Sequence, residues 1–183
     1  MGPWIAVLVV LYLSVAAAVV AARTGRSWIV VPAALPIALS IVLSLLGLRL
    51  PANPLFSIAI GLGFVLLATL GGSPLVALVL SLATRTVRLG THGGILVSDV
   101  DSPLPDREIL RGGTTIGYLE RFALIGSVLV GQPGAIAVIV AVKGLGRFSE
   151  LENASARERF IIGTLASLTW AGCCTAAILL TWA

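Results

Sequence analysis

Two apolar segments of this sequence carry charged residues that could form a binding site. Glu120 and Arg121 lie in the first segment, and Lys143 and Arg147 lie in the next. An ionisable side chain inside a membrane costs about 3 kcal/mol or more unless it is paired or hydrated, so such residues mark candidate sites. If the segments are neighbouring helices, one carboxylate faces several cations. We therefore predict a site for an anionic group, formed by Glu120, Arg121, Lys143, Arg147 and Arg159.

The same residues fit two other roles. Glu120 could pair with Arg121, Lys143 or Arg159 in a purely structural brace that joins three helices, because buried ion pairs often serve the specificity of packing. Glu120 could instead conduct an ion or a proton. Snorkelling toward the interface would account for Arg147 and, less easily, for Lys143. These alternatives stay open at the level of sequence.

The long polar segment at 85–111 offers a second, weaker candidate site. Asp99 and Asp101 could share a divalent cation such as Mg²⁺, which would suit an enzyme acting on a lipid-linked substrate. Acidic residues before prolines are also ordinary turn chemistry. The single histidine, His92, has no nucleophile or carboxylate placed to form a catalytic pair, and hydrolase, zinc-protease and P-loop motifs are absent. We predict no catalytic residues and no cofactor, and an enzyme remains only an alternative.

The composition is that of a membrane protein. Of 183 residues, 58% are hydrophobic and 11% are charged, and the mean hydropathy is +1.08. A soluble domain would carry roughly 25% charged residues. The net charge of +4 comes from basic residues in short loops between apolar segments, so it reflects membrane orientation rather than a nucleic-acid partner. Membrane lipids are the expected surroundings.

Apolar segments of about 20 residues, the length of a membrane-spanning helix, recur along the chain. They predict a single membrane domain over residues 1–183, an all-α bundle of about six transmembrane helices. The third segment is about 30 residues long and contains Gly71, Gly72 and Pro74, so we expect a broken or tilted helix there. The predicted spans are 3–22, 28–48, 55–84, 115–130, 135–146 and 160–181.

The distribution of basic residues predicts the orientation. If the third segment crosses once, ten basic residues share one face and only Arg49 lies on the other. An excess of Lys and Arg marks the cytoplasmic side, so both termini are predicted to be extracytoplasmic. Segment 85–111 is then a cytoplasmic loop, for which we expect irregular structure.

Small residues recur every four positions in two of the spans. The stripes are Ser14, Ala18 and Ala22 in the first span, and Gly163, Ser167 and Ala171 in the last. Such stripes let helices approach closely. Because a chain of this size offers little interior of its own, we predict a homo-oligomer or a partner membrane subunit.

The C-terminal half resembles a family of small bacterial multi-pass membrane proteins that has no assigned activity. The resemblance covers about residues 111–165 and rests on RGG-x-x-IG-x-LER at 111–121, AVKGLGRFSEL at 141–151 and RFIIGTL at 159–165. It implies a location in the bacterial inner membrane, with Glu120, Arg121, Lys143, Arg147 and Glu150 as matching positions. It implies no reaction.

Taken together, these features predict a transport-type or lipid-handling membrane protein that holds an anionic lipid or phosphate-type ligand in a cationic pocket in the cytoplasmic half of the bundle. A membrane-embedded Mg²⁺-dependent enzyme and a structural subunit of a larger complex are the alternatives.

Overall fold

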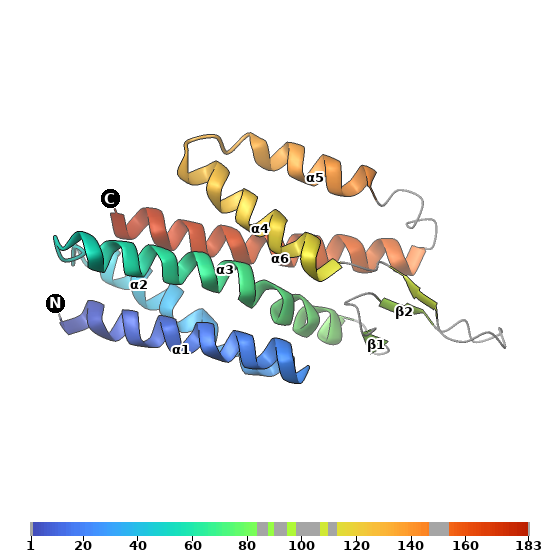
Figure 1. Cartoon of the computed structure of the whole chain (residues 1–183), viewed down its shortest axis with the longest axis horizontal. Coiled ribbons are helices and arrows are strands. Elements are labelled where there is room, and N and C mark those ends of the chain that lie inside the picture. The colour runs from blue at the N-terminus through green and yellow to red at the C-terminus, as the bar shows by residue number, and fades with distance from the viewer. Residues whose placement is uncertain are drawn as a thin grey trace.

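The computed structural model describes residues 2–83, 88–89, 95–97, 107–109, 113–146 and 154–182. Most of the described residues form a bundle of helices (Figure 1). In chain order these are α1 (Gly2–Thr24), the 3-10 helix η1 (Ser27–Ala34), α2 (Leu35–Leu45), α3 (Pro54–Ala83), α4 (Gly113–Leu129), α5 (Ala135–Leu145) and α6 (Ala154–Trp182). The predicted all-α bundle is therefore confirmed.

Successive passes of the chain run in opposite directions, and the two ends of the described chain lie at the same end of the bundle (Figure 1). The opposite end collects the last turns of α1 and α5 and the first turns of α6, which carry Arg23, Lys143, Arg157 and Arg159. We call this the basic end. The connection between α2 and α3, which contains Arg49, lies at the other end. The described cations are thus grouped as the predicted single crossing of α3 requires.

Four of the passes are long and apolar enough to cross a membrane: α1, the η1–α2 segment, α3 and α6. The other two are shorter. Helix α4 has 17 residues and α5 has 11, which at 1.5 Å per residue gives about 25 Å and 16 Å. A hydrocarbon core is about 30 Å thick, so six full crossings remain a prediction, although the described helices make six passes along the bundle.

Of the two alternatives predicted around Gly71–Pro74, a broken or a tilted helix, the break is wrong, because α3 is one helix of 30 residues with Pro74 inside it. A proline removes the hydrogen bond to the carbonyl four residues earlier, here Leu70. In a membrane bundle, groups of neighbouring helices can satisfy the carbonyls around such a site. Here Arg121 of α4 donates from Nε to the adjacent carbonyl of Thr69, at 3.0 Å. The helix continues through Pro74, and Arg121 contacts its backbone one residue before the carbonyl that lacks a helical partner.

Two other predicted boundaries shift. The span at 28–48 starts as the 3-10 helix η1, and α2 begins only at Leu35, with Pro36 in its first turn. Pro32 lies inside η1 and lacks an N–H, which disfavours a regular α-helix across this segment. The last helix, α6, begins at Ala154, six residues before the predicted start of the span. Its first turns carry charged residues, and these lie outside the apolar segment from which the span was predicted.

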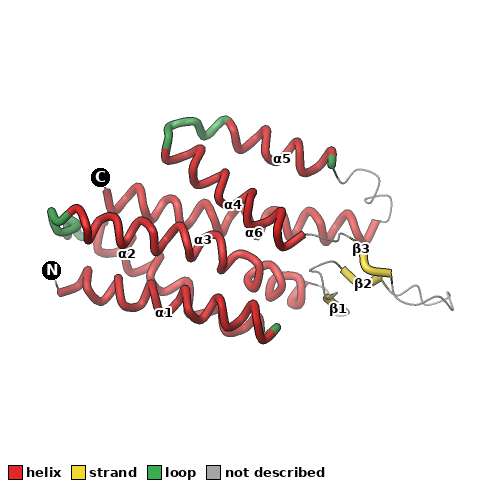
Figure 2. The backbone as a smooth tube through the Cα atoms, viewed as in Figure 1, coloured by secondary structure: helices red, strands yellow, loops and turns green. Residues whose placement is uncertain are grey.

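The expectation of irregular structure over 85–111 is also corrected, because the segment contains a small antiparallel sheet (Figure 2). Its strands are β1 (Arg88–Leu89), β2 (Ile95–Val97) and β3 (Arg107–Ile109), and Leu96 pairs with Arg88 on one side and Glu108 on the other. The apolar run at 95–97, which contains the β-branched residues Ile95 and Val97, favours a strand, but the surrounding glycines and prolines dominate the sequence pattern. Asp99 and Asp101 lie outside the described residues.

The bundle packs around α3, which contacts both α1 and α6 extensively. The buried positions of α1 alternate at spacings of three and four, as in a coiled-coil seam: Trp4, Val7, Leu11, Ser14, Ala18 and Ala21. Ser14 and Ala18 of the first small-residue stripe are thus buried within the chain, whereas Ala22 is exposed. In α6, Ser167 and Ala171 are buried too. Since the stripes are largely used inside the bundle, they no longer support the predicted oligomer, which remains untested.

Glycines of α3 accept large side chains from its neighbours. A Cβ atom on Gly61 would lie 2.6 Å from Trp182, one on Gly63 would lie 2.5 Å from Leu11, and one on Gly71 would lie 3.1 Å from Trp170. Trp170 also donates from Nε1 to the carbonyl of Leu67 at 3.2 Å. The missing side chains therefore allow α1 and α6 to pack directly on the backbone of α3.

Replacement of Gly63 by alanine tests this packing. The new methyl group would overlap the side chain of Leu11, and overpacking of this kind costs about 1–3 kcal/mol. We expect a lower midpoint of thermal unfolding in detergent. Gly126→Ala in α4 is the matched control, because open space surrounds that position and alanine favours a helix by about 1 kcal/mol. Equal midpoints for the two variants would contradict close packing at Gly63.

Candidate functional site

A cavity of about 1000 Å³ lies at the basic end of the bundle and is lined by residues of α1, η1, α3, α4, α5 and α6. Its walls are largely apolar and include Ala21, Ala77, Leu80, Val138, Val142 and Phe160. Glu120, Arg121, Lys143 and Arg159 also line it. The structure thus brings together four of the five residues predicted to bind an anionic group. The fifth, Arg147, lies outside the described residues.

Arg121 is the most deeply buried of these charges, with 2% of its surface exposed. Its guanidinium donates from Nε to the carbonyl of Thr69, from Nη2 to Oγ of Ser73 and from Nη1 to Oγ of Ser167. These three bonds measure 3.0, 2.9 and 3.0 Å. Arg121 therefore ties α4 to both α3 and α6.

Two glycines and an aromatic ring shape the space around Arg121. A Cβ atom on Gly72 would lie 2.5 Å from Cδ and Nε of Arg121, and one on Gly117 would lie 3.0 Å from its Nη1. The Tyr118 ring lies under the guanidinium, with its centroid 5.3 Å from Cζ, a distance at which a cation is attracted to the π face. Gly72 and Gly117 thus leave the room that the side chain of Arg121 occupies.

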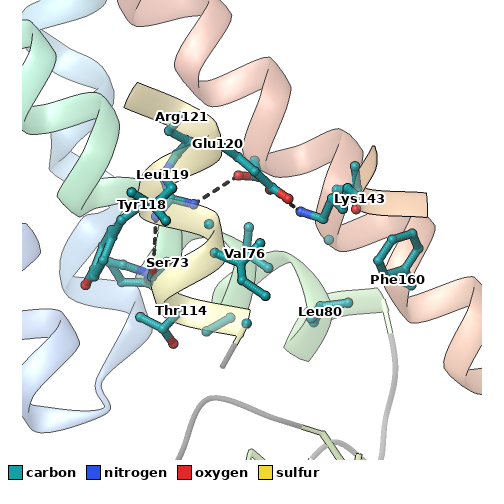
Figure 3. A pocket seen from close by; sticks show the side chains of 18 of the residues that line it. Ser73, Val76, Leu80, Thr114, Tyr118, Leu119, Glu120, Arg121, Lys143 and Phe160 are labelled. Atoms are coloured by element: carbon teal, nitrogen blue, oxygen red, sulfur yellow. Dashed lines mark hydrogen bonds and ion pairs between the residues drawn. The ribbon is translucent and has the colours of Figure 1, made fainter. Parts of the chain in front are cut away.

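Glu120, the neighbour of Arg121 in sequence, pairs with a different helix. Its Oε2 accepts a hydrogen bond from Nζ of Lys143, which reaches from the last turn of α5 (Figure 3). The same ammonium lies 5.9 Å from the centroid of the Phe160 ring in α6. The ion pair therefore connects α5 to α4 at the cavity, with Phe160 beside it.

Several polar atoms that are buried here have no hydrogen-bond partner within the described ranges. They are Oε1 of Glu120, Nε of Arg159 and Oγ1 of Thr164, and all three residues line the cavity. Leaving a buried polar atom without a partner costs about 1–3 kcal/mol. The cavity thus holds donors and an acceptor that water or a ligand can satisfy.

The cavity also has an unbalanced charge. Three cations, Arg121, Lys143 and Arg159, line it together with one anion, Glu120, so the formal charge of the described lining is 3 − 1 = +2. Only Lys143 is seen in an ion pair among the described residues, while Arg121 has neutral partners. Chemically, this arrangement suits the binding of an anion.

The remaining predicted residues cannot be placed at the cavity. Asp99 and Asp101, the predicted metal ligands, and Glu150, a position matched by the resemblance, lie outside the described residues. In the described part of the chain, no three His, Cys, Asp or Glu side chains come close enough to hold a metal ion. The Mg²⁺ site therefore stays a prediction.

The sequence reasoning missed the neutral partners of the site. Ser73 was part of the predicted helix break, and Ser167 was part of a small-residue stripe. Both are hydrogen-bond acceptors for Arg121. A hydroxyl within a stripe of glycine and alanine was the available signal, because the buried guanidinium needs several neutral acceptors.

No protein-family model, curated protein or solved structure matches this chain.

Substitution Arg121→Lys tests the role of the guanidinium in joining the helices. A lysine keeps the buried charge but presents one ammonium in place of the planar fork that reaches Thr69, Ser73 and Ser167. We expect a loss of roughly 2–4 kcal/mol in the free energy of unfolding, measured in detergent. Arg157→Lys is the control, because Arg157 is exposed on α6. A stable Arg121→Lys variant would mean that the three hydrogen bonds contribute little.

The pairing of Glu120 with Lys143 can be measured with a double-mutant cycle. Glu120→Gln and Lys143→Met each leave one buried charge without its partner, whereas the double variant removes both charges. The double variant is therefore expected to be less destabilised than the sum of the single variants, by about 1–3 kcal/mol. Additive losses in unfolding free energy would show that the two side chains act independently.

Proposed function

We propose that this helical membrane protein is a lipid-handling protein that binds an anionic lipid head group in the cavity at the basic end. The observation that carries the proposal is the combination of a formal charge of +2 with largely apolar walls in one cavity. A phosphate-type head group would meet the cations, and its hydrocarbon chains would meet the apolar walls.

The cations can reach such a ligand. Lys143 has three N–H donors and gives one to Glu120, and Arg159 has a buried Nε with no partner within the described ranges. Charge-assisted hydrogen bonds to phosphate oxygens are among the stronger polar interactions in proteins. Lys143 and Arg159 are accordingly the proposed contacts, with Arg121 holding the helices behind them.

The size and composition of the cavity favour a lipid over a free phosphate ion. Cavities for organic ligands measure about 300–1,000 Å³ and are mostly apolar, whereas a free phosphate would leave these walls without a partner. Anionic lipids and Lys/Arg-rich loops both favour the cytoplasmic side of a membrane, where we place the basic end. We include in this proposal that the protein lies in the bacterial inner membrane and that it is related to the family that residues 111–165 resemble.

One observation favours a second candidate, the structural brace. Arg121 joins α3, α4 and α6, and the Glu120–Lys143 pair holds α5, which is what a subunit of a larger complex would need to keep its shape. The two roles are compatible, because the brace uses Arg121 and leaves Lys143 and Arg159 at the cavity. Transport of the ligand stays a prediction, and so does an enzymatic step at Asp99 and Asp101, because no contact among the described residues bears on either role.

Thermal unfolding in maltoside detergent tests the proposed binding. Short-chain phosphatidylglycerol should raise the midpoint, and Lys143→Met and Arg159→Gln should each reduce the shift by at least half, because each removes a cation from the cavity. Arg157→Gln is the matched control: it removes an exposed cation from the same helix as Arg159 and should leave the shift unchanged.

Two further additives identify the source of the binding. Short-chain phosphatidylcholine has no net charge and should stabilise the protein less. Glycerophosphoglycerol, the same head group without hydrocarbon chains, tests for a soluble anion. An equal shift with glycerophosphoglycerol would replace the lipid by a soluble phosphodiester, and an equal shift with phosphatidylcholine, or in Lys143→Met, would contradict the anionic site.

A further inference from the structure

Glu120 is the one acidic side chain among the described residues that line the cavity, and it lies where the proposed anion would bind. It is 8% exposed, its Oε2 accepts from Nζ of Lys143, and its Oε1 is buried without a partner in the described part of the chain. A second anion placed on Lys143 would therefore share the cavity with a carboxylate (Figure 3).

We propose that Glu120 is a proton-binding site coupled to the anion site, so that the cavity takes up one proton on Glu120 when an anionic head group binds. This inference rests on the proposed function and deepens it. The proton joins the carboxylate oxygen and no other bond forms or breaks. Protonated Glu120 no longer forms an ion pair with Lys143, and the charge of the Lys143 ammonium, whose other N–H donors already face the ligand, is then balanced by the phosphate group.

Electrostatics gives the reason for the coupling. A carboxylate and a phosphate in one largely apolar cavity repel each other more strongly than they would in bulk water, because the effective dielectric constant is lower beside apolar walls. A proton on Glu120 removes this repulsion. It also makes the carboxyl group a hydrogen-bond donor that can face a phosphate oxygen. Bound ligand and bound proton therefore stabilise each other.

The other charged and titratable groups at the cavity cannot take this role. Arg121 and Tyr118 lie on the same helix as Glu120, Lys143 comes from α5 and Arg159 from α6. The described lining residues of α1, η1 and α3 are uncharged. Arginine, lysine and tyrosine are already protonated near neutral pH, so none of them can gain a proton there. Glu120 is the group in this set that can.

Linkage fixes the expected sign. If one proton is taken up with each ligand, the ligand must bind more tightly as the pH falls, by up to tenfold for each pH unit. A carboxamide at position 120 resembles the protonated carboxyl group and carries no charge at any pH. The Glu120→Gln variant should therefore bind the anion with an affinity that hardly changes with pH.

Isothermal titration calorimetry with dihexanoyl phosphatidylglycerol in maltoside detergent tests this coupling. The phosphodiester of this probe keeps its single charge between about pH 5.5 and 8.5, so a pH dependence comes from the protein. We expect the Kd of the wild-type chain to rise with pH, by up to tenfold per unit, and that of Glu120→Gln to stay constant within about twofold. Arg157→Gln should keep the wild-type dependence. Titrations in two buffers with different ionisation enthalpies measure the proton uptake directly, and need no variant of Glu120.

The outcomes separate the two proposals. Absence of binding in the wild-type chain at every pH would overturn the proposed function. Binding without proton uptake in the two-buffer titrations, or an unchanged pH dependence in Glu120→Gln, would overturn only the proton coupling. Glycerophosphoglycerol in place of the lipid shows whether a soluble phosphodiester is coupled to the same proton.

Discussion

The burial of one guanidinium constrains much of this structure. Arg121 is 2% exposed, and a charge removed from water in this way must find hydrogen-bond partners or destabilise the fold. Its partners are a carbonyl and a hydroxyl of α3 and a hydroxyl of α6. Gly72 and Gly117 leave space for the side chain. The position of α4 on the α3–α6 pair follows from these contacts, and with it the position of the cavity.

Because the hydrogen-bond partners of Arg121 are neutral, the carboxylate of Glu120 remains available to pair with another cation. The carboxylate reaches Lys143 at the end of α5, a helix that has no buried residue of its own. The turn between α4 and α5 holds the other end of the hairpin, with Gly131 in a left-handed conformation at φ 77°. Helix α5 is thus held at its two ends, and its apolar face borders the cavity in between.

Much of the fold follows from the sequence because lipid imposes a simple rule: a helix must be long and apolar to cross. The predicted break in α3 is wrong because a rule for soluble proteins was applied inside the bundle. Gly71, Gly72 and Pro74 are typical of a helix break in a soluble protein. In this bundle, side chains of neighbouring helices occupy the space beside the two glycines, and Arg121 donates a hydrogen bond to the nearby carbonyl of Thr69. At the site, charge identified Glu120, Arg121, Lys143 and Arg159. Ser73 and Ser167 were missed because a hydroxyl that serves a buried cation looks like any small residue in a stripe.

A purely structural brace would leave few buried polar atoms without a hydrogen-bond partner. Arg121 comes close to that standard, since each of its three nitrogens donates a hydrogen bond. Oε1 of Glu120, Nε of Arg159 and Oγ1 of Thr164 do not, because none has a partner within the described ranges. At about 1–3 kcal/mol each, three such groups would destabilise the fold, and a brace that only holds the helices together does not require them. The anion proposed for this cavity would give these groups hydrogen-bond partners and would balance the formal charge of +2.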